Sequence, residues 1–218
     1  MDWPLLGSLD EDDRRALLAT TRVRRFGRGE VVVHEGDPAD SLHLVESGRL
    51  AVRVTTPSGE RATLNLLGPG QYFGELSLLD GRAPIRSASI VALEPSTTRT
   101  LSATAFRELR QRHRAAERFL LALLARRVEE LSGRVVEVMY DGLDRRVHRR
   151  LVDLAALYDE GKPTVVITLT QELLAELVGG TRPSINQVLQ RLADQGIVEL
   201  GRGRITVLDR RALERKLG

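Results

Sequence analysis

The sequence contains no cysteine, and this absence excludes several kinds of chemistry at once. Without a thiol there is no disulfide, no thiolate nucleophile, no cysteine-ligated zinc and no cysteine-ligated iron–sulfur cluster. Aromatic residues are few, with 1 Trp, 3 Tyr and 4 Phe, which argues against binding single-stranded nucleic acid by base stacking. No apolar run approaches the roughly 20 residues of a membrane-spanning helix. Because Asp2 and the acidic residues 10–13 stand where an export signal would be basic, we expect a cytoplasmic protein without a membrane partner.

The sequence offers no candidate for catalysis or metal binding. Its histidines, His34, His43, His113 and His148, lack ligand spacing, so surface or hydrogen-bonding roles fit them better. The glycine-rich segment 68–74 misses the spacing of a dinucleotide fingerprint and is interpreted as a turn. There is neither a phosphate loop nor a Gly-x-Ser-x-Gly elbow, so we expect no enzyme and no bound cofactor.

Charge is unevenly distributed, although the formal net charge is only +3. Residues 1–144 carry 20 basic and 21 acidic side chains, whereas residues 145–218 carry 13 basic and 9 acidic ones. The positive excess therefore belongs to the C-terminal third. It fits either a nucleic-acid surface or a solvated, salt-bridged helical face.

Residues 22–101 are rich in short β-forming runs that glycine and proline turns separate. A short helix, capped by Asp10, is predicted before them over residues 10–20. The predicted strands cover residues 30–34, 41–45, 50–55, 62–67, 87–92 and 97–101. This spacing indicates an N-terminal antiparallel β-roll, and with the helices that follow the fold class is α+β.

A long helix is predicted from residue 114 to about residue 139, after a short helix over residues 104–111. Its apolar residues recur at the alternating three- and four-residue spacing of a coiled-coil seam. A helix packed only on its own domain would give a broader apolar stripe, and this alternative stays open. The favoured interpretation is a homodimer joined through Leu121, Leu124, Val128, Leu131, Val135 and Val138.

The C-terminal part shows the order helix, tight turn, helix, hairpin, which predicts a winged helix-turn-helix. Its predicted elements are a hinge at residues 140–143, a helix that Asp144 caps, a strand over 164–169, helices that Thr170 and Thr181 cap, and hairpin strands over 197–200 and 204–208. Two helices packed inside an α/β core are the alternative.

The helix after Thr181 has an apolar face for burial and an opposite polar face. An arginine can form two hydrogen bonds with guanine and a glutamine can do so with adenine, so Arg182 and Gln187 are the candidate base readers. Pro183 and Ser184 lie beside them at the start of the helix. The candidates for phosphate contacts are Thr170, Arg191, Arg202 and Arg204.

Residues 73–88 place Glu75 and Arg86 eleven positions apart around a short helical turn. Arg86 can neutralise a phosphate, Ser87 can add a hydroxyl, and Glu75 can accept a hydrogen bond from a ribose hydroxyl. Backbone N–H groups near Gly74 can reach the same ligand. Taken alone, the residues fit a structural ion pair between Glu75 and Arg86 more simply.

Several motifs, spread in order along the chain, together resemble the CRP/FNR family of bacterial transcription regulators. They are His34-Glu35-Gly36-Asp37 with Gly48, residues 68–74, Gly74-Glu75-Leu76 with Arg86-Ser87-Ala88, Ala125-Arg126-Arg127, Leu169-Thr170 and residues 178–189. The resemblance implies a cyclic-nucleotide-binding β-roll over residues 1–113, a dimerisation helix and hinge over 114–143, and a winged helix-turn-helix over 144–218. It also implies a homodimer that binds palindromic double-stranded DNA and contacts RNA polymerase.

Cyclic AMP is the effector that this resemblance implies. The residues that it assigns to the ligand are Gly74 and Glu75 at the ribose with Leu76 in the same motif, Arg86 and Ser87 at the cyclic phosphate, and Leu131 and Ser132 at the adenine. Leu131 departs from the polar residue of the family and cannot hydrogen-bond the exocyclic amine of adenine. Other nucleotides, a ligand-independent DNA-binding regulator with a structural roll, and a nucleotide-regulated enzyme subunit are the alternatives.

Overall fold

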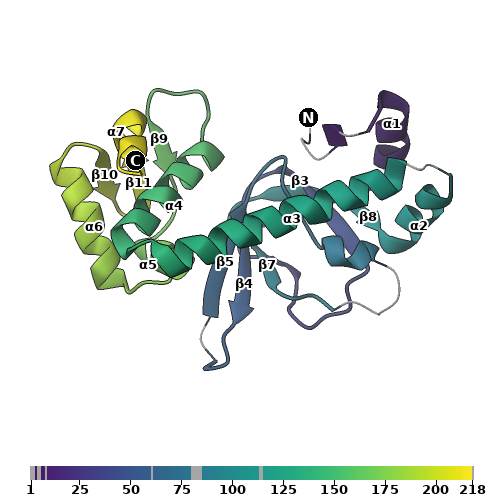
Figure 1. Ribbon diagram of the computed structural model, residues 1–218, viewed down its shortest axis with the longest axis horizontal. Helices are drawn as coiled ribbons and strands as arrows, with labels where there is room; N and C mark the ends of the chain where they lie inside the picture. The colour runs from purple at the N-terminus through teal and green to yellow at the C-terminus, as the bar shows by residue number, and fades with distance from the viewer. Residues whose placement is uncertain are drawn as a thin grey trace. The chain divides into compact units, whose positions relative to one another are not determined.

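The computed structural model describes residues 3, 6–7, 9–59, 61–79, 85–112 and 115–217 (Figure 1). The chain divides into two compact units, Met1–Leu131 and Ser132–Gly218. The long helix α3, Ala115–Tyr140, is continuous and contributes residues to both units. Within the described residues, no helix is long and apolar enough to cross a membrane.

The first unit contains the predicted antiparallel β-roll, which in its described part consists of two four-stranded sheets. The strand order is β1-β8-β3-β6 in one sheet and β2-β7-β4-β5 in the other. The strands are β1 (Arg22–Phe26), β2 (Val31–Val33), β3 (Ser41–Ser47), β4 (Leu50–Thr55), β5 (Arg61–Leu67), β6 (Tyr72–Phe73), β7 (Ser89–Ala92) and β8 (Ser96–Ser102).

The first unit also contains α1 (Glu11–Ala19) before the strands, the short 3-10 helix η2 (Glu75–Leu78) between β6 and β7, and α2 (Ala103–Arg112) between β8 and α3. The side chain of Asp10 accepts a hydrogen bond from the backbone N–H of Asp13, so the predicted cap of α1 is confirmed. Strands β1 and β6 were not predicted, because one is mostly arginine and the other is two residues long.

The core of the first unit lies on both faces of β3, and the first five residues of this strand are buried. Leu42 and Leu44 pack with α1, α2 and α3 in one cluster. Val45 joins a second cluster, to which both sheets contribute. The burial of both faces includes the polar residues Ser41 and His43 of this strand.

The long helix presents two different faces in the described chain. Ala116, Phe119, Leu120 and Leu123 are buried in the cluster with β3, and Leu124 packs partly against it. The other seam residues are exposed, from 50% at Leu131 to 68% at Val138, and include Leu121, Val128 and Val135. Packing on its own unit thus accounts for the start of α3 and leaves most of the seam uncovered.

The second unit is the predicted winged helix-turn-helix. Its elements after α3 are α4 (Leu143–Leu157), β9 (Val165–Ile167), α5 (Gln171–Val178), α6 (Arg182–Asp194), β10 (Val198–Gly201), β11 (Arg204–Val207) and α7 (Arg210–Arg215). The three strands form an antiparallel sheet in the order β10-β11-β9. Helix α7 was not predicted.

The expected caps in the second unit are correct at two positions and wrong at one. Thr170 accepts from the backbone N–H of Leu173, and Thr181 accepts from that of Ser184. The cap of α4 is Gly142, not Asp144. The carboxylate of Asp144 is instead bonded to Arg191 on α6, so a long-range ion pair replaces the local cap.

Gly48, which connects β3 to β4, provides a test of the packing between the two sheets. A Cβ at this position would lie 2.2 Å from Ser96 Oγ and 2.6 Å from the carbonyl oxygen of Pro95, at a φ of +78°. Gly29 has a φ of +82° but open space around it. We expect Gly29→Ala to lower the free energy of unfolding by about 1–2 kcal/mol, and Gly48→Ala by roughly 1–3 kcal/mol more, in urea titrations. Equal losses would contradict this packing.

Candidate functional site

A pocket opens in the first unit where η2 approaches the segment before β7. Its lining combines apolar side chains of the roll with Glu75, Arg86 and Ser87, and α3 contributes Arg127. The other lining residues are Val33, Ala39, Val52, Leu67, Tyr72, Phe73, Gly74, Leu76, Ser77, Ile85, Ala88 and Ile90. The structure therefore brings together the predicted ribose and phosphate residues Gly74, Glu75, Leu76, Arg86 and Ser87. Leu131 and Ser132 are exposed on α3 and are not part of this lining.

Arg86 is the main charged group of the pocket, and it is 6% exposed. Its Nη1 donates to the carbonyl oxygen of Ser41 at 2.8 Å, and its Nη2 donates to Ser41 Oγ at 3.1 Å. Asp40 Oδ1 lies 3.5 Å from Nη2. Burial lowers the pKa of Arg86, and the carboxylates of Asp40, Asp37 and Glu75 act in the opposite direction. Because an arginine side chain stays protonated in proteins, the pocket holds a fixed positive charge.

Gly74 allows the guanidinium of Arg86 to occupy this place. The residue caps η2 with a φ of +82°, which favours glycine. A Cβ here would lie 2.3 Å from Arg86 Nη1 and 2.6 Å from the carbonyl oxygen of Ser41. Any other residue at position 74 would therefore displace one of the two partners.

Glu75 and Arg86 do not form the ion pair that was the alternative interpretation of their spacing. In the described part of the chain, Arg86 is paired with Asp40, whereas Glu75 Oε1 lies 3.5 Å from Arg127 Nε on α3. Ser87 is exposed at the pocket. A buried cation beside an exposed hydroxyl is suited to an anionic oxygen ligand such as a phosphate. Residues 80–84, which include Gly81 and Pro84 of the motif region, lie outside the described residues.

His43 supports the same corner of the roll from inside the core. Its Nδ1 lies 3.1 Å from Thr98 Oγ1 and its Nε2 lies 3.4 Å from Ser41 Oγ. The ring stacks on Phe73 with centroids 4.6 Å apart. The hydrogen-bonding role expected of this histidine is thus confirmed. No cluster of possible metal ligands occurs among the residues that the structure describes.

The second unit exposes the polar face that the sequence predicts for α6. Ile185, Val188, Leu189 and Leu192 are buried. Arg182, Pro183 and Gln187 are exposed, with Ser184 partly buried beside them. Arg202 and Arg204 are exposed on the hairpin of β10 and β11, and the side chain of Thr170 is occupied as the cap of α5.

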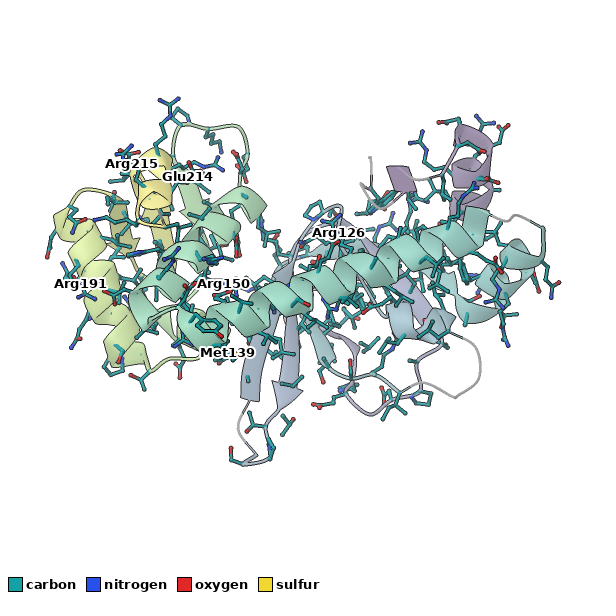
Figure 2. All side chains as sticks on the ribbon, viewed as in Figure 1. Arg126, Met139, Arg150, Arg191, Glu214 and Arg215 are labelled. Atoms are coloured by element: carbon teal, nitrogen blue, oxygen red, sulfur yellow. The ribbon has the colours of Figure 1, made fainter. Side chains whose placement is uncertain are left out.

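Arg191 differs from the other predicted phosphate contacts because it already has an acidic partner. It lies on α6, as Figure 2 labels it, and its Nη2 donates to the two carboxylate oxygens of Asp144 at 2.8 and 2.7 Å. Sequence reasoning missed this pair, as it missed Asp40 and Ser41 beside Arg86. No local spacing signals either contact, since both join residues more than 40 positions apart.

Comparison with known proteins gives matches to both units. Family models match residues 23–113 as a cyclic nucleotide-binding domain and residues 145–216 as a Crp-like helix-turn-helix domain. The cyclic AMP receptor protein of Thermus thermophilus is 33% identical over 211 residues, which are 97% of this chain and 95% of that protein. A CRP-like cAMP-activated global transcriptional regulator of Mycobacterium tuberculosis is 30% identical over 195 residues, 88% of this chain and 86% of that protein. The crystal structure of the Thermus thermophilus catabolite activator protein is similar with a TM-score of 0.56 and 32% identity, and the match covers 98% of each chain.

The fold and these matches define a class of protein, the DNA-binding transcription regulators that carry a cyclic nucleotide-binding domain. The similarity to relatives extends over nearly the whole chain. The chain belongs to the CRP/FNR family, as its sequence motifs predicted. The members of this family are transcription regulators and not enzymes.

The buried state of His43, which contacts Ser41 beside Arg86, can be tested by the pH dependence of stability. Burial, and then the charges of Arg86 and Arg24, lower the pKa of His43 from 6.5 to about 3, against the opposing effect of Asp40. Below pH 6.5 the unfolded chain therefore binds a proton that the folded chain does not. We expect wild-type stability to fall relative to that of His43→Gln by up to about 1.4 kcal/mol per pH unit below this value, measured by urea unfolding at several pH values. Parallel pH profiles would show that His43 is not buried in its neutral form.

Proposed function

We propose that the protein is a homodimeric, sequence-specific DNA-binding transcription regulator that cyclic AMP controls by binding in the roll. The observation that carries this proposal is that the buried Arg86 lines a pocket, together with Glu75 and Ser87. The family membership and the exposed polar face of α6 support the proposal that the protein binds DNA. A DNA target suits a cytoplasmic protein, and a regulator of this kind acts through RNA polymerase.

For the ligand, the proposal assigns the cyclic phosphate to Arg86 and Ser87 and the ribose to Gly74 and Glu75. Two relatives whose names refer to cyclic AMP support this choice. The adenine would be covered by Leu131 and Ser132, of which Leu131 offers only an apolar contact. This apolar contact favours weak discrimination between bases. It is the specific reason to test two alternatives to cyclic AMP control, namely another nucleotide as the effector and a roll with a purely structural role.

For the dimer, the proposal joins two chains along the seam of α3. The exposed residues Leu121, Val128, Leu131, Val135 and Val138 support it, because single chains rarely leave such an apolar row uncovered. Leu124, partly buried in its own unit, would sit at the edge of the contact. The proposed domains are a ligand-binding domain over residues 1–113, a dimerisation helix and hinge over 114–143, and a DNA-binding domain over 144–218.

For DNA, the proposal places α6 of each chain in the major groove. Arg182 and Gln187 would read base edges, with Pro183 and Ser184 beside them. The residues that would contact phosphates are Thr170, Arg191, Arg202 and Arg204. Two such helices reach successive major grooves when they are held about 34 Å apart, so the ligand can control binding by setting this separation.

Arg86→Leu tests the ligand. Loss of a charged hydrogen-bonding group is expected to weaken cyclic AMP binding by about 10- to 100-fold in calorimetry. Arg99→Leu is the control, because Arg99 pairs with Glu46 outside the pocket. Circular dichroism identifies any variant that fails to fold, and Arg86→Lys then replaces Arg86→Leu. Cyclic GMP titrated in parallel reports selectivity for the base. If Arg86→Leu leaves cyclic AMP binding unchanged, or leaves the nucleotide dependence of DNA binding unchanged, the proposed regulation by cyclic AMP is wrong.

Selection of bound sequences from a random duplex pool, with and without cyclic AMP, tests the DNA-binding part. We expect a palindrome that is enriched when cyclic AMP is present. Gln187→Ala should relax one base position in each half-site, at about 1–3 kcal/mol of discrimination, while Gln195→Ala at the end of α6 should leave the motif intact. Arg202→Ala should reduce the salt dependence of binding by about one counterion. Enrichment of a single half-site without its inverted copy would contradict the dimer.

A further inference from the structure

A tyrosine of the pocket reaches the backbone of the long helix. Tyr72 lines the pocket beside Phe73, and its hydroxyl donates to the carbonyl oxygen of Leu123 on α3 at 3.2 Å. Tyr72 is partly buried and packs against the cluster that holds the start of α3. The side chain is therefore part of the pocket wall and part of the attachment of the helix.

A second contact joins η2 to α3 one helical turn further along. Arg127, which follows Leu123 by four residues, pairs with Glu75 through Nε at 3.5 Å. In an α-helix the carbonyl of residue 123 also accepts the backbone N–H of residue 127. The hydroxyl of Tyr72 and the carboxylate of Glu75 thus converge on a single turn of α3.

This turn lies next to the seam of the helix. Leu124 and Val128, two residues of the seam, directly follow the anchored residues Leu123 and Arg127. A shift or rotation of the anchored turn must move these seam residues with it, because the helix is continuous there. The pocket wall is consequently tied to the surface on which two chains are proposed to meet.

We infer that Tyr72 is a positioning residue whose hydroxyl transmits occupancy of the pocket to α3 and so to DNA binding. The inference rests on the proposed function, because it assigns a regulatory route to the same pocket. Burial, and then the charges of Glu130 and Glu75, raise the pKa of Tyr72 to about 12, so the hydroxyl keeps its proton and remains a donor near neutral pH. The ring alone would fill the wall of the pocket without holding the helix.

Tyr72→Phe separates these two roles, because it keeps the ring and removes the donor. The matched control is Tyr158→Phe in the second unit, where the hydroxyl of Tyr158 donates to the carbonyl oxygen of Thr168 at 3.3 Å. Calorimetry on the full chain measures cyclic AMP affinity. Fluorescence anisotropy with a selected palindrome measures DNA affinity without and with saturating cyclic AMP, and the ratio of the two affinities is the coupling.

We expect Tyr72→Phe to change cyclic AMP affinity by less than about threefold but to reduce the coupling ratio by at least about threefold. Tyr158→Phe should leave that ratio unchanged. The inference is overturned if Tyr72→Phe keeps the wild-type ratio, if its loss of coupling only follows a loss of cyclic AMP affinity, or if Tyr158→Phe reduces the ratio equally.

The failure of the proposed function gives a different result from the failure of this inference. If the wild-type chain does not bind cyclic AMP, the proposed effector is wrong. In that case the anchored turn is still expected to set the ligand-free state, so Tyr72→Phe must change DNA affinity without nucleotide relative to wild type and to Tyr158→Phe. Unchanged ligand-free affinity would then overturn the role of Tyr72 as well.

Discussion

The buried guanidinium of Arg86 constrains much of the roll around it. Removing a charge from water costs several kcal/mol unless hydrogen bonds and opposite charges compensate for the loss. Here the compensation comes from the backbone and side chain of Ser41 and from Asp40, all near the start of β3. The missing Cβ at Gly74 leaves room for the group, and His43 contacts Ser41 from the core side. The positive charge of the pocket is therefore held in place by groups of the protein itself, without a ligand.

The long helix has two roles that the structure assigns to different faces. One face is buried in the core of the first unit through residues such as Phe119 and Leu123. A neighbouring face stays apolar and exposed beyond the point where that core ends. Because the same helix carries the partner of Glu75, the pocket, the core and the exposed seam share one continuous helix. A continuous helix of this kind can carry the effect of a local contact to a neighbouring surface.

The features that the sequence predicts well are local. The threonine caps at positions 170 and 181, the hairpin around Gly203 and the apolar spacing of the long helix depend on residues only a few positions apart. The roll was predictable as an architecture, whereas β1 was not, because its arginines suppress the usual strand signal. For the pocket, the motif indicated Arg86 but not its partner Ser41, since their contact depends on how distant strands fold together. The local sequence made Asp144 resemble a cap, because its actual partner, Arg191, lies on another helix and is distant in the sequence.

The arginines of β1 have a further physical consequence. This strand lies at one edge of its sheet, and the opposite edge strand, β6, is only two residues long. A sheet edge offers unpaired N–H and C=O groups to any extended chain nearby, and such edges are starting points for aggregation. Arg22, Arg24 and Arg25 are exposed along β1, so two copies that approach edge to edge bring like charges together. Strand addition between copies of the chain is thereby disfavoured at the β1 edge of this sheet.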